Sequence, residues 1–195
     1  MNKHIFTLLL LLLSLSGCFN QVREQEAIAQ YDLFLENVHE LFGYHTIEDG
    51  LFYNEFYHTK ESIRSHLSEF MTDEGVSWFL NEFYMLKDGR YVYAEKVQNY
   101  LNGEGSSNFY DVMKNSVFNP GLRMIVEEDI KINDLDGEIE MKMEDAPIQF
   151  YQQGSTYGES EFGELGYPST DYISVRVVMV KDDETYRISY LEVQS

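Results

Sequence analysis

Apolar residues in the first half of the chain recur at the spacing of amphipathic helices. From Ala27 onward they follow the i, i+3, i+4, i+7 pattern, which stops before Gly43, a residue type that often ends a helix. Two further helices are predicted to begin after Thr59 and Thr72, because a threonine side chain accepts a hydrogen bond from the first helical turn. The first half is therefore predicted to supply three helices.

The second half changes to the alternation of β-strands. Ile139 and Met141 alternate with charged residues, and Asp136-Gly137 favours a turn in front of them. The same alternation runs through the last segment, where a turn is predicted after Asp182. Helices followed by antiparallel strands are typical of the α+β class. We expect the N-terminal helices to pack on a curved, cone-like antiparallel sheet.

The remaining segments carry weaker patterns. Residues 51–57 are dense in aromatic side chains without a clear period, and we expect a short buried segment there. Residues 87–90 favour a turn, and residues 102–107 favour an exposed loop. Residues 152–170 contain glycines and a proline among acids, which predicts a long irregular connection.

The extreme N-terminus has the composition of an export signal. A basic start precedes the leucine run 8–13, which is too short to span a bilayer, since spanning takes roughly 20 apolar residues. The next residues, Leu15-Ser16-Gly17-Cys18, resemble the bacterial lipobox at every position. This resemblance implies cleavage after Gly17 and a diacylglycerol on the Cys18 sulfur. The alternative is an ordinary signal peptide that is cleaved before Gly17.

Lipidation would divide the chain into three parts and set its location. The parts are a signal peptide (1–17), a lipidated tether (18–26) and a single α+β domain (27–195). Two acyl chains give the durable attachment that a single chain does not. Cys18 is the only cysteine, so no disulfide is expected. We expect a lipoprotein of the bacterial cell envelope, anchored in the cell membrane with its body on the extracytoplasmic side.

The charge of the chain narrows the choice of partners. There are 34 Asp and Glu residues against 14 Lys and Arg, which gives a net charge of −20. Such a protein is repelled by nucleic acid and by anionic lipid headgroups, because both are bound through clustered basic residues. We therefore expect no nucleic-acid partner, and we expect attachment to the membrane to depend on the lipid anchor.

Two stretches carry a resemblance to a known family. They are "SIRSHLSEFMTDEGVSWFLNEFYMLKDGRYVY" and "YISVRVVMVKDDETYRISYLEV". Together with the N-terminal helix, they resemble uncharacterised extracytoplasmic lipoproteins of Firmicutes that contain a nuclear transport factor two-like, or SnoaL-like, cone domain. The resemblance implies a cone-shaped α+β fold. That superfamily holds enzymes such as ketosteroid isomerase as well as binding and spacer domains, so it assigns no catalytic residue here.

Metal chemistry receives little support from the residue spacing. Four histidines, His39, His45, His58 and His66, lie close in sequence, but they form no His-x-x-x-His pair on one helical face. We therefore predict no metal centre. Acid runs such as 127–129 and 182–184 are expected on solvated faces. Two of them brought together by the fold would offer oxygen ligands for weak binding of a divalent cation.

The sequence favours a binding role over catalysis. It contains no Gly-x-Ser-x-Gly nucleophile motif and no glycine-rich phosphate loop, so we expect no cofactor. We expect a non-enzymatic binding or interaction module, with an envelope protein or a small ligand as its partner. One alternative is a small cone-pocket enzyme of the isomerase or dehydratase kind, which would use a buried carboxylate and a tyrosine. A structural spacer is the other alternative.

Overall fold

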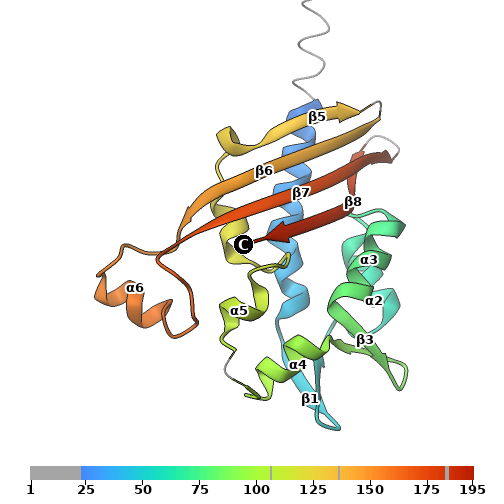
Figure 1. Cartoon of the computed structure of the whole chain (residues 1–195). Coiled ribbons are helices and arrows are strands. Elements are labelled where there is room, and N and C mark those ends of the chain that lie inside the picture. The colour runs from blue at the N-terminus through green and yellow to red at the C-terminus, as the bar shows by residue number, and fades with distance from the viewer. Residues whose placement is uncertain (1–22, 106, 136, 183–184) are drawn as a thin grey trace, which may run out of the picture.

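The computed structural model describes residues 23–105, 107–135, 137–182 and 185–195. The predicted signal peptide and the lipobox at residues 15–18 lie outside these described ranges. Helices dominate the first part of the described chain and antiparallel strands the last part, which confirms the α+β class. Figure 1 shows the N-terminal helix, in blue, crossing behind the strands of a four-stranded sheet.

The helical elements are short apart from the first. They are the N-terminal helix (residues 23–38 of the described chain), η1 (His39–Phe42), α2 (Lys60–Leu67), α3 (Asp73–Phe83), α4 (Glu95–Leu101), α5 (Phe109–Met113), η2 (Pro120–Met124), η3 (Glu127–Asp129) and α6 (Thr156–Glu161). Among the described residues, no helix is both long and apolar enough to cross a bilayer.

The strands form one four-stranded sheet and two small hairpins. The sheet has the order β5 (Lys131–Leu135), β6 (Glu138–Gln149), β7 (Thr170–Asp182), β8 (Thr185–Gln194). The hairpins pair β1 (His45–Glu48) with β2 (Leu51–Asn54), and β3 (Tyr84–Lys87) with β4 (Arg90–Tyr93). All pairings are antiparallel. The predicted hairpins before residue 144 and at the end of the chain are therefore confirmed.

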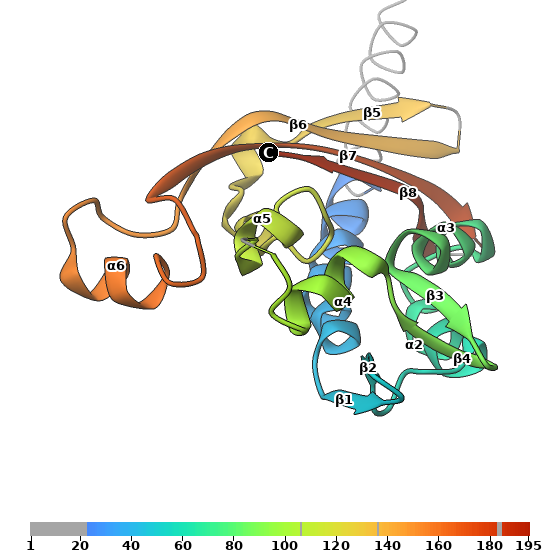
Figure 2. The ribbon, with the colours of Figure 1, turned by 60° about the horizontal axis from the view of Figure 1, so that its bottom comes forward.

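The inner face of the sheet is filled with side chains. Met141 pairs with Val177, and Val177 pairs with Leu191, so one row of buried apolar residues crosses three strands. Figure 2 shows the sheet bending over the helices on that side. The register shifts between Met143 and Ala146, and again after Val178, and such bulges bend and twist a strand locally. Helix and sheet residues share one hydrophobic core.

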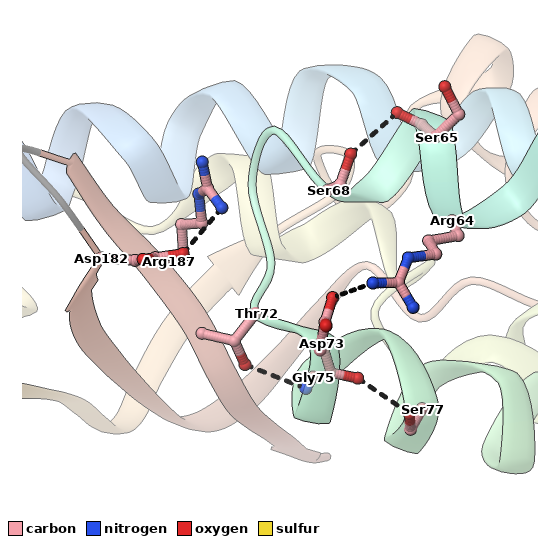
Figure 3. Close-up of polar contacts among 9 residues, drawn as sticks. All are labelled: Arg64, Ser65, Ser68, Thr72, Asp73, Gly75, Ser77, Asp182 and Arg187. Carbon is pink, nitrogen blue, oxygen red and sulfur yellow. Dashed lines mark hydrogen bonds and ion pairs between the residues drawn. The ribbon is translucent and has the colours of Figure 1, made fainter.

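The second and third helices begin where the sequence predicts. The Thr59 side chain caps α2, and the Thr72 side chain accepts a hydrogen bond from the Gly75 backbone N–H at 3.1 Å (Figure 3). The Thr72 N–H also donates to the Ile188 carbonyl at 3.0 Å, which ties the start of α3 to β8. A Cβ atom on Gly75 would lie 2.4 Å from that carbonyl oxygen. Only glycine permits this approach without movement of the backbone.

Several segments differ from their sequence patterns. The N-terminal helix already includes residues 23–26, which the sequence assigns to the tether, because Arg23 is held by the Tyr186 hydroxyl at 2.8 Å and by an ion pair with Asp134. The predicted buried segment at 51–57 instead supplies β2. The irregular connection 152–170 contains α6, whose start is capped by the Ser155 side chain. These elements depend on helix caps and on contacts between residues that are far apart in the sequence. The spacing of apolar residues does not reveal such contacts.

Candidate functional site

A pocket of about 450 Å³ opens around η1, and none of its lining residues belongs to the four-stranded sheet. One wall comes from the end of the N-terminal helix and from η1, and the other from the segment between α5 and η2. The lining residues are Leu35, Val38, His39, Glu40, Phe42, Gly43, Tyr44, Phe109, Val117, Phe118, Asn119, Pro120, Arg123 and Tyr167. This volume lies in the range of small-molecule sites.

Aromatic rings form the apolar wall of the pocket. The Phe42 ring centroid lies 5.3 Å from that of Phe118 and 6.1 Å from that of Phe109. The Phe109 ring centroid lies 6.1 Å from that of Tyr167, which belongs to the connection between β6 and β7. Four aromatic residues that line the pocket are only partly buried: Phe42, Phe109, Phe118 and Tyr167. Rings in this arrangement offer a stacking surface for an apolar or aromatic group.

The buried side chain of Asn54 fixes the mouth of the pocket. Its Nδ2 donates to the carbonyls of Glu40 at 2.7 Å and Gly43 at 2.9 Å, and its Oδ1 accepts from two backbone N–H groups of the following loop. Gly43 itself is extended at φ −130°, and Tyr44 takes the left-handed conformation at φ 46°. This conformation costs a non-glycine residue about 1 kcal/mol. Tyr44 is nevertheless held there, 63% exposed at the pocket mouth.

Arg123 provides a cationic group in the opposite wall. Its Nη2 donates to the Leu35 carbonyl at 2.7 Å and lies 3.1 Å from Nδ1 of His39. Because a guanidinium only donates, this contact requires Nδ1 of His39 to be the unprotonated ring nitrogen. The two contacts fasten the guanidinium to the end of the N-terminal helix. Of the four histidines considered in the sequence, His39 lines this pocket.

A second pocket of about 560 Å³ lies along the same helix and shares Leu35 and Arg123 with the first. It is acidic: Asp32 and Glu36 line it from the helix, and Glu127 lines it from η3. Partial burial raises the pKa of Asp32, and the nearby carboxylates of Glu127 and Glu36 raise it further. The fold therefore brings one predicted acid run next to helix acids. Within the described ranges, no three His, Cys, Asp or Glu residues are grouped closely enough to hold a metal ion.

Each of the other three histidines contacts different residues. Nδ1 of His45 is 3.1 Å from the Tyr93 hydroxyl, and Nε2 of His66 is 3.2 Å from the Asn37 carbonyl oxygen. The ring of His58 stands edge-on to Tyr53 at 5.6 Å. These contacts anchor loops and helices to one another.

A carboxylate and a tyrosine meet outside the pockets. The Tyr110 hydroxyl donates to Asp171 at the start of β7, and the Ser195 hydroxyl donates to the same carboxylate. Burial raises the pKa of Asp171, but the hydrogen bonds from Ser195 and Tyr110 outweigh it, so the pKa lies below its usual value. Burial raises the pKa of Tyr110 to about 12. At neutral pH the pair is therefore a carboxylate that accepts a hydrogen bond from a neutral phenol.

Sequence reasoning missed most of the pocket residues. The segment 112–126 supplies part of the pocket wall, and it contains Lys114 and Arg123 but no Asp or Glu. In so acidic a chain, an acid-free segment is a signal that could have drawn attention to Arg123. No family model matches the chain, and no curated protein sequence is significantly similar to it.

Proposed function

We propose that this protein is a lipid-anchored binding protein on the extracytoplasmic side of the bacterial cell membrane, and that a small ligand occupies the pocket around η1. The binding function is proposed because the structure leaves an open pocket around η1, whereas the inner face of the sheet is buried. Met141, Val177 and Leu191 fill the inner face of the sheet, whereas a pocket of about 450 Å³ with an aromatic wall stays open beside it. Small-molecule sites have this composition of apolar walls and a few polar groups.

The architecture also supports a cone domain of the nuclear transport factor two-like kind. Helices cover the inner face of a bent antiparallel sheet, as in the cone that the sequence resemblance implies (Figure 2). In such a cone, an enzyme of the isomerase kind needs an enclosed carboxylate with a raised pKa. The Tyr110–Asp171 pair gives no support to this alternative, because the pKa of Asp171 is lowered. The pKa of Asp32 is raised, but no tyrosine is among the residues that line its pocket. A spacer function would not require a pocket with fixed polar groups.

The pocket lies toward the C-terminal end of the described N-terminal helix, and the proposed anchor precedes that helix in the sequence. Cys18 precedes the first described helical residue, Arg23, and the pocket begins near Leu35 and ends past Phe42. The described helical residues 23–38 span about 24 Å at 1.5 Å per residue. Attachment through Cys18 would therefore join the described domain at the end of this helix that is remote from the pocket.

Replacement of the proposed lipid-bearing residue tests the anchor. We expect Cys18→Ser to abolish lipid attachment and to move the protein out of the sedimenting envelope fraction, because a hydroxyl does not substitute for the thiol in forming the thioether. Intact-mass measurement of the unaltered protein should show a diacylglycerol on a chain that begins at Cys18. Ser14→Ala, outside the four lipobox positions, is the matched control and should sediment normally. A Cys18→Ser protein that still sediments with the envelope would refute the anchor.

A further inference from the structure

Arg123 differs from the other arginines in its charge environment. Five arginines of the described chain form ion pairs with carboxylates: Arg23, Arg64, Arg90, Arg176 and Arg187. Arg123 forms no such pair in the part of the chain that the structure describes, although the protein carries a net charge of −20. An arginine that forms no direct ion pair at the wall of a pocket is positioned to bind an anion from outside.

Two contacts hold the guanidinium of Arg123 in place, and they involve only part of its hydrogen-bond donors. Of its five N–H donors, the contacts to Leu35 and His39 involve only those on Nη2. The residue is exposed and lines both pockets. A planar guanidinium with free donors matches an acidic group in a two-pronged hydrogen bond. Because its position is already fixed, a ligand would order little additional structure on binding.

The rest of the pocket limits the ligand to one negative charge and an apolar body. Phe42 and Phe118 provide a partly exposed aromatic wall, which suits a flat ring. Glu40 lines the same pocket, where its carboxylate accepts a hydrogen bond from the Tyr57 hydroxyl at 3.2 Å. Asp32 and Glu36 line the adjoining pocket. These carboxylates repel any charge beyond the one that Arg123 compensates.

We propose that the pocket around η1 binds an amphipathic organic anion, with an aromatic or apolar body against the Phe42 and Phe118 rings and a single acidic group on the guanidinium of Arg123. This inference rests on the proposed function, since it names the ligand class of the same pocket. It predicts that the charge of the ligand is recognised separately from its ring.

A pair of matched probes separates the two contributions. 2-Naphthoate and 2-naphthamide share one ring system, but only the first is an anion at neutral pH. Their affinities are measured by equilibrium dialysis against the full chain in a non-ionic detergent, with detergent micelles alone as the blank. We expect the unaltered protein to bind naphthoate more tightly than naphthamide. We expect Arg123→Gln to weaken naphthoate binding about tenfold and to change naphthamide binding less than twofold.

Three variants serve as controls for charge, shape and folding. Arg64→Gln removes the same charge at an exposed position on α2 and should leave both affinities unchanged. Arg123→Lys keeps the charge but loses the planar fork, so naphthoate binding should weaken less than in Arg123→Gln. Gly43→Leu adds a side chain to the pocket lining at an extended backbone position and should weaken both probes. Circular dichroism melting curves verify that each variant is folded.

The outcomes distinguish the binding function of the pocket from the assignment of an anionic ligand. If Gly43→Leu weakens both probes but Arg123→Gln leaves their affinity ratio unchanged, the pocket is a binding site and the assignment of an anion is wrong. If neither probe binds the unaltered protein above the micelle blank, the binding function of this pocket and the anion assignment both fail.

Discussion

The inner face of the sheet and the pocket around η1 are both built mainly of apolar side chains, but their packing differs. On the sheet, Met179 and Ile188 are opposite each other on paired strands, and both are fully buried. Around η1, the aromatic rings of Phe42 and Phe118 pack at a tilt of 40° and remain partly exposed. Regular strands align side chains in rows that close on one another, whereas short helical turns and loops do not.

The two regions also differ in how they treat charge. On the outer face of the sheet, Glu140 lies between Lys142 and Arg176, so the charges compensate one another. At the pocket, Arg123 is bound by a backbone carbonyl and a histidine. Paired charges stabilise a surface but leave little for a partner, whereas an uncompensated charge in a fixed position favours recognition. The contrast is what we expect if the sheet is the scaffold and the pocket is the binding region that we propose.

The largest expected effect comes from a cavity under the sheet. Met179→Ala should lower the free energy of unfolding by about 2 to 5 kcal/mol, because it removes a fully buried side chain and leaves a void. Met124→Ala makes the same change in η2, where the side chain is 43% exposed, and should cost less than about 0.5 kcal/mol. Urea denaturation measures both. Equal losses would mean that the sheet is not the more tightly packed region.

A smaller difference in stability is expected between alanine substitutions at two glycines. Gly75→Ala should lower the free energy of unfolding by about 1 to 3 kcal/mol, because the new Cβ would meet the Ile188 carbonyl oxygen at 2.4 Å. At Gly43 the nearest atom would lie 3.7 Å from the new Cβ and the backbone is extended, so Gly43→Ala should be neutral or stabilising by up to about 1 kcal/mol. Thermal unfolding of both variants tests this. A destabilised Gly43→Ala protein would contradict the open packing at the pocket.

The smallest effect concerns the charges on the outer face of the sheet. Hydrogen bonds from Lys142 and Arg176 lower the pKa of Glu140 to about 2. A carboxyl group with a lowered folded-state pKa stabilises the protein above its unfolded-state pKa of about 4.3, and the contribution is lost as the pH falls toward 2. Glu140→Gln should therefore be less stable than the unaltered protein at pH 6, with the difference shrinking below pH 4.

Denaturation at pH 6, 4 and 3 measures this trend. Glu138→Gln is the matched control, since Glu138 lies on the same strand and forms no ion pair with another described residue. A stability difference for Glu140→Gln that stays constant down to pH 3 would show that this ion-pair network does not titrate as expected.

Much of the fold could be predicted from local patterns. Thr59 and Thr72 cap helices, and the alternation around Met141 marks a strand with one buried face, because these signals lie within a few residues of one another. The β1–β2 hairpin was missed, since its aromatic residues do not alternate cleanly and its partner strand is polar. The helical residues 23–26 were missed because their support comes from Tyr186, at the other end of the chain.

Local sequence patterns were enough to predict the α+β class, the starts of α2 and α3, the two long hairpins and the charge that disfavours nucleic acid. The lipobox at 15–18 remains a prediction from the sequence, with its test in Cys18→Ser. The burial of the inner face of the sheet, and the contact of Arg123 with Leu35, 88 positions away, at the wall of an open pocket, became visible in the folded chain. Local patterns report which face of an element is apolar, but free volume and charge compensation depend on residues that folding brings together from distant parts of the chain.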